Sequence, residues 1–328
     1  MKKIRRVIQK DQDLMHLTWM VNNICQNKCS YCIPGLNSGK GHHYKWENAK
    51  RFMDILFERY PKIHCSVTGG EPSISSFFPE LVQRFVDAGH TIGTTTNGFK
   101  PVEYWKDISK NLNYICFSYH PESPTEDFLD KVLYCSLNTM VTVRIMMHPR
   151  YWDHCVEIYN DIRNIPTIFV EPVRCLDWGS VDRTVHLYNE DQLAWFKDVE
   201  SSLGHQKYLK EERYTDEKFE KFNRTPDITA EFEMDDGTIE RDTNTLNYIN
   251  SGQTNFKGYV CEVGLKSLFV DHSGEIFLGN CCIGGPQGHM DEPDEIKWPT
   301  KRVICSKHIC HCSIDVNINK WTRGYFRQ

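Results

Sequence analysis

Between residues 14 and 173, strand-like and helix-like segments alternate, and this alternation most constrains how the chain can fold. Short apolar or β-branched runs predict strands over residues 14–22, 63–68, 90–96, 114–119, 140–147 and 168–173. Apolar residues at helical spacing predict helices over residues 44–59, 77–88, 104–110, 125–136 and 152–163. Such repeats call for parallel strands joined by right-handed helical crossovers. We therefore predict an α/β fold, a partial (βα)6 barrel similar to an open TIM barrel.

Small and polar residues stand at or near the carboxyl ends of the predicted strands. In β/α barrels, the chemistry takes place at this end of the sheet. We expect the following side chains to surround one site: Cys25, Gly70, Glu71, Asn97, Ser118, His120 and Arg144.

Three cysteines follow the first predicted strand at spacings of four and three residues, namely Cys25, Cys29 and Cys32. A structural tetrahedral metal site takes four protein ligands, whereas a reactive site keeps one position open. Thiolates are the usual ligands of iron–sulfur clusters. A cubane cluster held by three of them leaves one iron free. Zinc would more often show paired C-x2-C spacings, and here only Cys29 and Cys32 have that spacing.

The pattern C-x3-C-x-aromatic-C, formed here with Tyr31 as the aromatic residue, resembles the signature of the radical S-adenosylmethionine (SAM) superfamily. The resemblance implies a [4Fe–4S] cluster whose free iron binds the amino and carboxylate groups of SAM. One electron from the cluster then splits a C–S bond of SAM, and the resulting 5′-deoxyadenosyl radical abstracts a hydrogen atom. Three of the 14 cysteines could also match this pattern by chance.

The same resemblance implies which residues contact SAM. Gly70 and Glu71 match a glycine–glycine–glutamate segment that meets the SAM amino group, although two glycines could also mark a plain tight turn. By position, Asn97 lies beside SAM, Ser118 contacts the ribose, Arg144 the carboxylate and Tyr31 the adenine. A strand-end serine can equally be a cap, and an arginine in a strand can have an ordinary carboxylate partner.

His120 occupies a position where the family often carries an acidic residue, two residues after Ser118. Imidazole can donate or accept a proton near neutral pH, which makes His120 the candidate catalytic group toward the substrate. The alternative is a histidine that is hydrogen-bonded at the start of a loop.

A second cysteine group surrounds a predicted hairpin with strands over residues 266–271 and 275–278. It resembles the SPASM/twitch extension of radical SAM enzymes, which implies one auxiliary [4Fe–4S] cluster. The preferred ligands are Cys261, Cys281, Cys310 and Cys312, with Cys305 close behind and Cys282 as a replacement for Cys281. The alternative is a structural zinc site assisted by His308 and His311.

We expect three domains: a radical SAM core over residues 1–173, a connecting and substrate-covering segment over 174–257, and an auxiliary-cluster domain over 258–328. Within the middle segment, the sequence predicts an amphipathic helix over 188–203 and a solvated charged helix over 207–224. It also predicts a hairpin over 230–242 that turns at Asp-Gly.

Composition narrows the partners and the compartment. A net charge of −5 argues against non-specific binding of nucleic acid. No apolar stretch reaches the roughly 18 residues of a membrane span. Fourteen cysteines without an export signal indicate reduced thiols in the cytoplasm.

The resulting hypothesis is a radical SAM enzyme that oxidises or rearranges a small polar substrate similar to a sugar or nucleotide. It would draw electrons from a flavodoxin- or ferredoxin-type donor. Only 24 residues precede Cys25, which is short for a leader-peptide-binding domain and favours this substrate class. The alternative is a maturase that modifies ribosomally made peptides. Two hypotheses of other classes are a non-catalytic iron–sulfur electron carrier or redox sensor, and a zinc-stabilised binding module.

Overall fold

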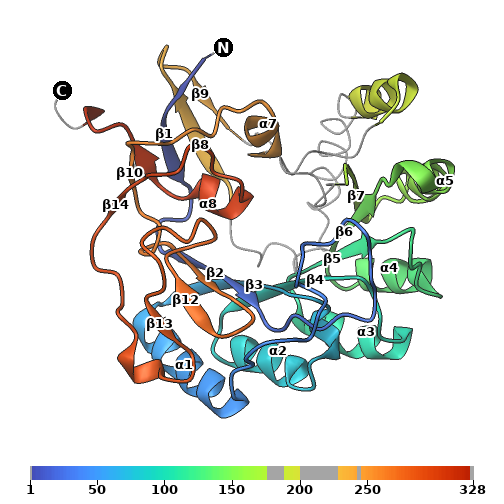
Figure 1. The fold of residues 1–328 in the computed structure, drawn as a ribbon, viewed down its shortest axis with the longest axis horizontal. Coiled ribbons are helices and arrows are strands. Elements are labelled where there is room, and N and C mark those ends of the chain that lie inside the picture. The colour runs from blue at the N-terminus through green and yellow to red at the C-terminus, as the bar shows by residue number, and fades with distance from the viewer. Residues whose placement is uncertain (1, 176–187, 200–227, 242–244, 326–328) are drawn as a thin grey trace.

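A computed structural model describes residues 2–175, 188–199, 228–241 and 245–325. Its largest element is a nine-stranded sheet in the order β13-β12-β11-β2-β3-β4-β5-β6-β7 (Figure 1). The six central parallel strands are β2 (Leu14–Met20), β3 (Lys62–Thr68), β4 (Thr91–Thr96), β5 (Tyr114–Tyr119), β6 (Met140–Met146) and β7 (Ile168–Val173).

Five helices connect these strands: α1 (Trp46–Arg59), α2 (Phe78–Asp87), α3 (Val102–Ile108), α4 (Phe128–Ser136) and α5 (Trp152–Ile162). All six predicted strands and all five predicted helices are therefore present, with ends shifted by a few residues at most. Short 3₁₀ turns accompany them as η1 (Pro72–Ile74), η2 (Ser109–Asn111) and η3 (Pro149–Tyr151). The mixed α/β fold is confirmed, while the predicted partial-barrel form stays a prediction.

The two faces of the sheet differ in polarity because successive side chains of a strand point to opposite faces. One face packs on the helices and is apolar; in β2 it carries Leu17 and Trp19, which bury against Phe52 and other residues of α1. Helix α1 turns one face to this core through Ala49, Phe52, Met53 and Leu56. The other face is polar, with residues such as His16, Thr18, His64, Ser66, Thr142 and Arg144.

A second, six-stranded sheet runs in the order β14 (Val303–Ile304), β10 (Val260–Cys261), β15 (Lys320–Trp321), β1 (Ile4–Gln9), β8 (Ala230–Met234) and β9 (Ile239–Glu240). Its neighbouring strands are antiparallel, and its core is formed by Ile4, Val7, Phe232 and Phe256 among others. Both ends of the chain lie on this side of the molecule (Figure 1).

This sheet combines strands from each of the three predicted domains. The predicted boundaries at residues 173 and 257 stay a prediction. Strand β1, which the sequence analysis did not foresee, pairs with β8 from the middle of the chain and with β15 from its end.

The predicted C-terminal hairpin is present as β11 (Ser267–Val270) and β12 (Glu275–Phe277). Strand β11 pairs in parallel with β2, so the hairpin and the following β13 (Gly288–His289) extend the large sheet instead of standing apart from it. Short helices α7 (Thr245–Asn250), η6 (Pro293–Glu295) and α8 (Ser313–Asn317) complete the described C-terminal part.

The middle of the chain is described in part. Residues 190–199 are helical, as predicted, and β8 and β9 form the predicted hairpin, where Gly237 has a φ of +83°. The predicted helix over 207–224 lies outside the described residues. Among the helices of the described ranges, none has the length and apolar character that crossing a bilayer requires.

Candidate active site

A cavity of about 550 Å³ lies at the carboxyl ends of the parallel strands, beside the loop that carries the first cysteine group. It brings together residues that are as much as 288 positions apart in the sequence, from Cys25 to Ser313. The sequence-predicted residues that line it are Cys25, Cys29, Tyr31, Cys32, Gly70, Asn97, Ser118, His120 and Arg144. Glu71 is not among the lining residues.

The three thiols of the loop are partly or wholly buried: Cys29 is buried, while Cys25 and Cys32 are half-buried. Burial raises the pKa of all three thiols, that of Cys29 to about 11. Burial disfavours the negatively charged thiolates. A bound metal cluster would offset this cost, because it binds the thiolate form. The side-chain amide of Asn97 donates to the Cys25 sulfur at 3.5 Å, so β4 also contacts the loop.

The separation of the thiols bears on the kind of metal centre that each cysteine group could hold. Within the described ranges, the only three cysteine, histidine or acidic ligand atoms that lie within 4.8 Å of one another belong to His42, His289 and Asp291. Neither cysteine group is therefore gathered as tightly as one zinc ion would require. A cubane is larger than one ion, and its thiolates stand farther apart.

Two residues that the sequence analysis did not assign support the loop. Both carboxylate oxygens of Glu122 accept hydrogen bonds from Ser30, one from its backbone N–H and one from its hydroxyl, each at 2.7 Å. Cys175 is buried in contact with the group formed by Cys29 and Tyr31. Glu122 could have been predicted as a site residue, because it follows closely after the predicted strand over residues 114–119. Nothing in the sequence pointed to Cys175.

Tyr31 and His120 contact each other across the cavity wall. The Tyr31 hydroxyl lies 3.0 Å from Nδ1 of His120, and the two rings are stacked with centroids 5.9 Å apart. Burial lowers the pKa of His120 to about 4, so its imidazole is neutral at pH 7. The predicted adenine contact of Tyr31 and the catalytic role of His120 stay predictions. In this structure the ring of Tyr31 already has a partner.

The glycine pair after β3 is explained by the backbone beside it. A Cβ on Gly70 would lie 2.3 Å from the carbonyl oxygen of Ile24, and one on Gly69 would lie 2.4 Å from that of Asn22. The N–H groups of Gly70 and Glu71 donate to these same carbonyls, at 2.9 and 2.7 Å. The sequence analysis expected the glycines to admit a ligand. The structure shows that they admit the chain that leads into Cys25.

Replacing Gly70 by Ala should therefore disturb the cysteine loop itself. Because the clash is with backbone atoms, which cannot rotate away, we expect a loss of about 1–3 kcal/mol in stability, as for overpacked cores. Thermal unfolding and the iron content after anaerobic cluster reconstitution would both fall. The matched control is Gly324→Ala, because a Cβ there meets no atom within 4 Å. Equal iron content in the two variants would contradict this account.

Glu71 lies beneath the cavity and connects two loops. One of its oxygens accepts hydrogen bonds from the Ser73 N–H, the Ser73 hydroxyl and the Thr96 hydroxyl, at 2.6–3.0 Å. The other accepts from the Asn97 N–H at 2.7 Å. Burial raises the pKa of Glu71, although these hydrogen bonds act in the opposite direction. The predicted cofactor contact of the Glu71 side chain stays a prediction, and the observed contacts position Asn97.

Ser118 and Arg144 are direct neighbours in the register of β5 and β6, and Glu171 of β7 is next in the same row. Arg144 donates from Nε to Glu171 at 2.8 Å, so the ordinary carboxylate partner that the sequence left open is present. An arginine has five N–H donors. A further carboxylate contact from Arg144 therefore stays a prediction, as does the ribose contact of Ser118.

A second cavity of about 570 Å³ adjoins the first and shares Thr68, Thr95, Arg144, Glu171 and Cys312 with it. Its floor is the polar face of the sheet, where His16 and His64 lie with 1% of their surface exposed. Both ring nitrogens of His16 and Nε2 of His64 have no hydrogen-bond partner in the protein. Unpaired buried polar groups of this kind are costly, which favours a polar ligand or ordered water above them.

The two buried histidines predict acid sensitivity. Burial lowers the pKa of His16 to about 4 and that of His64 to about 3, below the usual value near 6.5. The unfolded chain therefore binds more protons than the folded one between about pH 6.5 and pH 4, and stability falls as the pH is lowered through this range. We expect the melting temperature of His16→Asn to depend less on pH than that of wild type. The exposed control His43→Asn should follow wild type.

The C-terminal thiols fall into a group of four and two others. Cys261 and Cys281 share an apolar cluster, and charges on Cys261 and Cys305 would raise the pKa of Cys281. Charges on Cys261 and Cys281 act on Cys310 in the same way, so these four thiols are neighbours. Cys312 lines both cavities, and it also lines a smaller third cavity together with Cys281. Cys282, in a left-handed backbone conformation with a φ of +49°, directs its thiol to the Asn280 carbonyl.

Comparison with known proteins identifies part of the chain. Residues 19–134 match the family model described as the Radical SAM superfamily. The chain carries a radical SAM domain. Such a domain implies a [4Fe–4S] cluster and SAM as cofactors, and proteins of this superfamily are enzymes.

Two curated relatives match the same part of the chain. One is a 7,8-dihydro-6-hydroxymethylpterin dimethyltransferase of Methanocaldococcus jannaschii, 34% identical over 98 residues, or 29% of this chain and 18% of the relative. The other is a GTP 3',8-cyclase of Vibrio atlanticus, 29% identical over 119 residues, or 31% of this chain and 34% of the relative. This chain thus spans about a third or less of either relative.

Two solved structures share the fold over a larger part of this chain. One is anSMEcpe with bound AdoMet and Cp18Cys peptide, with a TM-score of 0.51 and 13% identity, covering 85% of this chain and 78% of that one. The other is Streptococcus suis SuiB bound to its precursor peptide SuiA, with a TM-score of 0.52 and 10% identity, covering 87% and 64%. At these identities the likeness concerns the fold.

Proposed function

We propose that this protein cleaves SAM reductively and uses the resulting radical to abstract hydrogen from a polar substrate. One observation carries the proposal: a single cavity joins the three loop thiols with polar residues from the ends of β3 to β7. When bound, the cluster and SAM would supply the electron and the radical. Cys25, Cys29 and Cys32 would hold the cluster, and the open side of the cavity would hold SAM.

The chain's own residues would shape the surroundings of SAM. Asn97 contacts the Cys25 sulfur and is fixed by Glu71 through its backbone, so its amide is held at the edge of the cluster site. Arg144, paired with Glu171, offers a positive charge where a carboxylate would be bound. Neutral His120 could accept or donate a hydrogen bond without adding charge.

The adjoining cavity is the proposed substrate site. Its walls are the polar face of the sheet and the segment around Ser313, and its position beside the first cavity lets a substrate approach SAM. The hydroxyl, amide and imidazole groups of Thr18, Ser66, His64 and Asn280 stand among apolar side chains such as Met140 and Phe169. Such a lining suits a small molecule that has both hydrogen-bonding and apolar parts. A sugar- or nucleotide-like substrate fits this lining.

A peptide-modifying activity is the second candidate. It is supported by the fold that the chain shares with anSMEcpe and SuiB, two proteins solved with bound peptides. The hydrogen-bonding groups around the second cavity could also receive one polar side chain of a peptide.

An auxiliary [4Fe–4S] cluster belongs to the same proposal. We place it on Cys261, Cys281, Cys305 and Cys310, the four thiols that lie near one another. Cys312, a preferred ligand in the sequence analysis, would face the substrate instead. A flavodoxin- or ferredoxin-type protein is the proposed electron donor.

The test is SAM cleavage by the anaerobically reconstituted protein with a chemical reductant, measured as 5′-deoxyadenosine formed. The proposal expects this product in amounts that depend on both the reductant and the reconstituted iron. An iron-containing protein that yields none would favour an electron carrier or redox sensor. A protein that takes up zinc but no iron would favour a binding module.

A further inference from the structure

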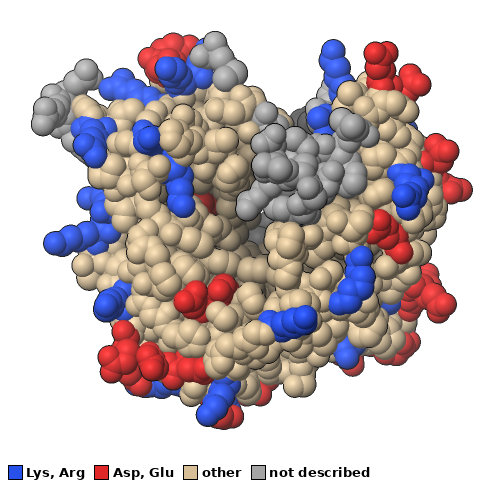
Figure 2. Space-filling view, viewed as in Figure 1, with Lys and Arg blue, Asp and Glu red and all other residues tan. Residues whose placement is uncertain are grey.

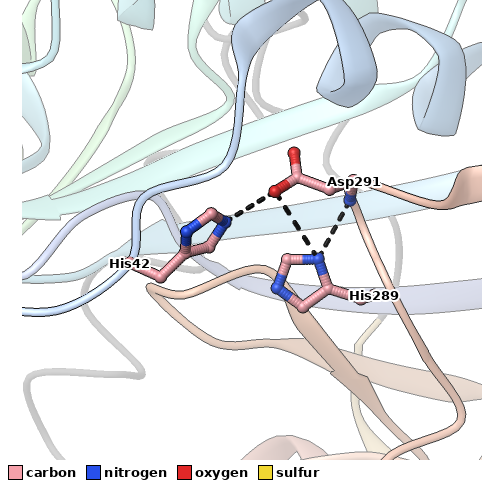
Figure 3. A group of neighbouring side chains, drawn as sticks. All are labelled: His42, His289 and Asp291. Carbon is pink, nitrogen blue, oxygen red and sulfur yellow. Dashed lines mark hydrogen bonds and ion pairs between the residues drawn. The ribbon is translucent and has the colours of Figure 1, made fainter.

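A group of three potential metal ligands lies outside both cavities. His42 stands in the loop before α1, His289 ends β13, and Asp291 follows two residues later (Figure 3). Oδ2 of Asp291 lies 2.6 Å from Nε2 of His42 and 3.8 Å from Nδ1 of His289. One ligand atom from each residue lies within 4.8 Å of the other two, so small side-chain movements would bring all three onto one ion.

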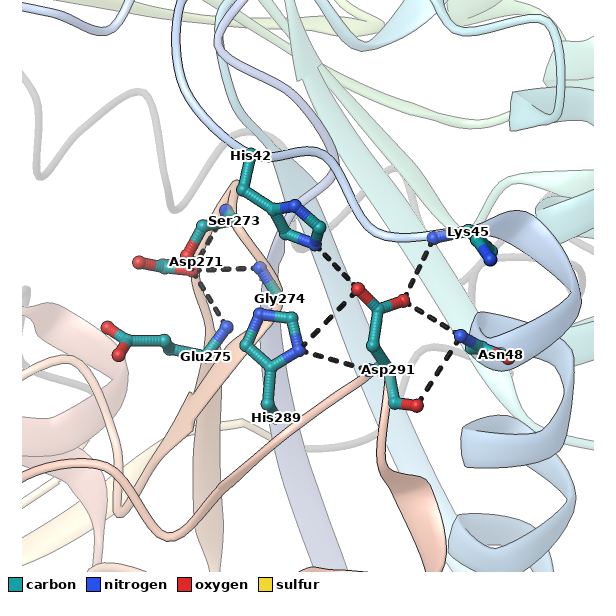
Figure 4. Close-up of polar contacts among 9 residues, drawn as sticks. All are labelled: His42, Lys45, Asn48, Asp271, Ser273, Gly274, Glu275, His289 and Asp291. Atoms are coloured by element: carbon teal, nitrogen blue, oxygen red, sulfur yellow. Dashed lines mark hydrogen bonds and ion pairs between the residues drawn. The ribbon is translucent and has the colours of Figure 1, made fainter.

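The carboxylate of Asp291 is oriented by contacts on its far side. Its Oδ1 accepts hydrogen bonds from the Lys45 N–H at 3.1 Å and from the Asn48 amide at 2.8 Å, which leaves Oδ2 facing the two imidazoles (Figure 4). Burial alone would raise the pKa of Asp291, but the hydrogen bonds from Asn48, Lys45 and His42 lower it to about 2. The group is therefore charged at neutral pH. Metal-binding carboxylates are commonly held by outer partners in this manner.

We propose that His42, His289 and Asp291 bind one divalent ion that favours imidazole and carboxylate ligands, such as zinc. Two imidazoles and one carboxylate leave a fourth position for water. The ion would replace two contacts seen here, the His42–Asp291 hydrogen bond and the bond from the Asp291 N–H to Nδ1 of His289, which is 3.0 Å long. This site uses no thiol and is separate from both proposed iron–sulfur sites.

The position of the site suggests that a bound ion would stabilise the contact between two distant segments of the chain. It joins the start of α1, in the first quarter of the chain, to the segment after β13. The same segments also meet in the 2.7 Å ion pair of Arg51 with Asp294. Further along, Trp298 stacks on Phe52 at 6.3 Å. Acidic side chains gather over η6 and α1 in Figure 2, with basic side chains among them. An ion here would hold the hairpin extension of the large sheet against the helical layer.

The test is equilibrium dialysis of the anaerobically reconstituted protein against zinc, with zinc and iron measured by mass spectrometry in the same sample. Wild type should bind one zinc more per chain than the double variant His42→Ala/His289→Ala, whose affinity should fall at least about tenfold, as for lost ligand-shell contacts. The matched control is His43→Ala, an exposed neighbour outside the group. Zinc should also raise the melting temperature of wild type and of the control, but not of the double variant.

The ligand type gives a second, independent readout. X-ray absorption at the zinc edge should show nitrogen and oxygen at about 2.0–2.1 Å and no sulfur near about 2.3 Å. Equal zinc in wild type and double variant, sulfur in the coordination shell, or no zinc bound to wild type would each overturn the proposal. If the double variant loses iron as well, Asp291→Asn serves in its place, because it keeps the acceptor for Lys45 and Asn48. Failure of SAM cleavage alone would leave this inference unaffected.

Discussion

Replacing Cys29 by Ala is expected to abolish SAM cleavage. The variant removes the most buried of the three thiols that line the first cavity, and two thiolates cannot hold the cubane at the open end of the strands. Since losses of outer-shell partners alone cost 10–100-fold, we expect the loss of a direct ligand to exceed about a hundredfold. The measurement is 5′-deoxyadenosine formed per chain under reducing conditions.

The matched control is Cys135→Ala, which removes a buried thiol on α4, outside both cavities. This control should keep the iron content and the cleavage activity of wild type. If Cys29→Ala cleaves SAM as fast as the control does, the cluster is not held by this loop and the proposed function fails. Cys175, which packs beside Cys29, would then be the first residue to examine as a ligand.

Replacing Cys310 by Ala should separate the two proposed clusters. We expect the iron content to fall by half, from about eight to about four atoms per chain, because one of two [4Fe–4S] clusters is lost. Uncoupled SAM cleavage should persist at least in part, since the first cavity does not include Cys310. Product formation from the true substrate should end. If Cys310→Ala lost SAM cleavage as completely as it lost product formation, separate roles for the two clusters would be contradicted.

Cys305 and Cys312 decide between the two ligand sets. The structure groups Cys305 with Cys261, Cys281 and Cys310, so Cys305→Ala should lose the same half of the iron. Cys312→Ala should keep all of it, because Cys312 faces the cavities. The reverse result would support the set preferred from the sequence, with Cys312 as a ligand. Measuring the iron content of Cys305→Ala, Cys310→Ala and Cys312→Ala in parallel distinguishes the two ligand sets.

Local patterns in the sequence were enough to predict the six parallel strands from β2 to β7 and the five helices between them. The spacing of apolar residues marks each strand and helix, and right-handed crossovers leave few ways to arrange six β–α units. For the same reason the sequence placed Cys25, Gly70, Asn97 and Arg144 at one edge, because parallel strands end on the same side. Their presence in one cavity follows from that topology.

The tertiary structure decided what depends on contacts between distant segments. Strand β1 is too mixed in composition to be recognised alone, and its partners β8 and β15 come from distant parts of the chain. The glycines after β3 make room for backbone 46 residues away, between Gly70 and Ile24, and no local pattern records such a neighbour. Likewise, the spacing of Cys305, Cys310 and Cys312 gives their order but not the direction of each thiol.

The sequence by itself thus predicted the helices and strands of residues 14–173 and their parallel topology, since both follow from local spacing and from the handedness of connections. The cluster-binding role of its first cysteine group stays a prediction. Only the folded molecule showed how the C-terminal hairpin joins β2, which thiols lie together, and that His42 meets Asp291. These features depend on packing between segments up to 251 residues apart, as between His16 and Ser267. The burial and the charge environment of these side chains arise only when the distant segments pack together, so no local pattern in the sequence records them.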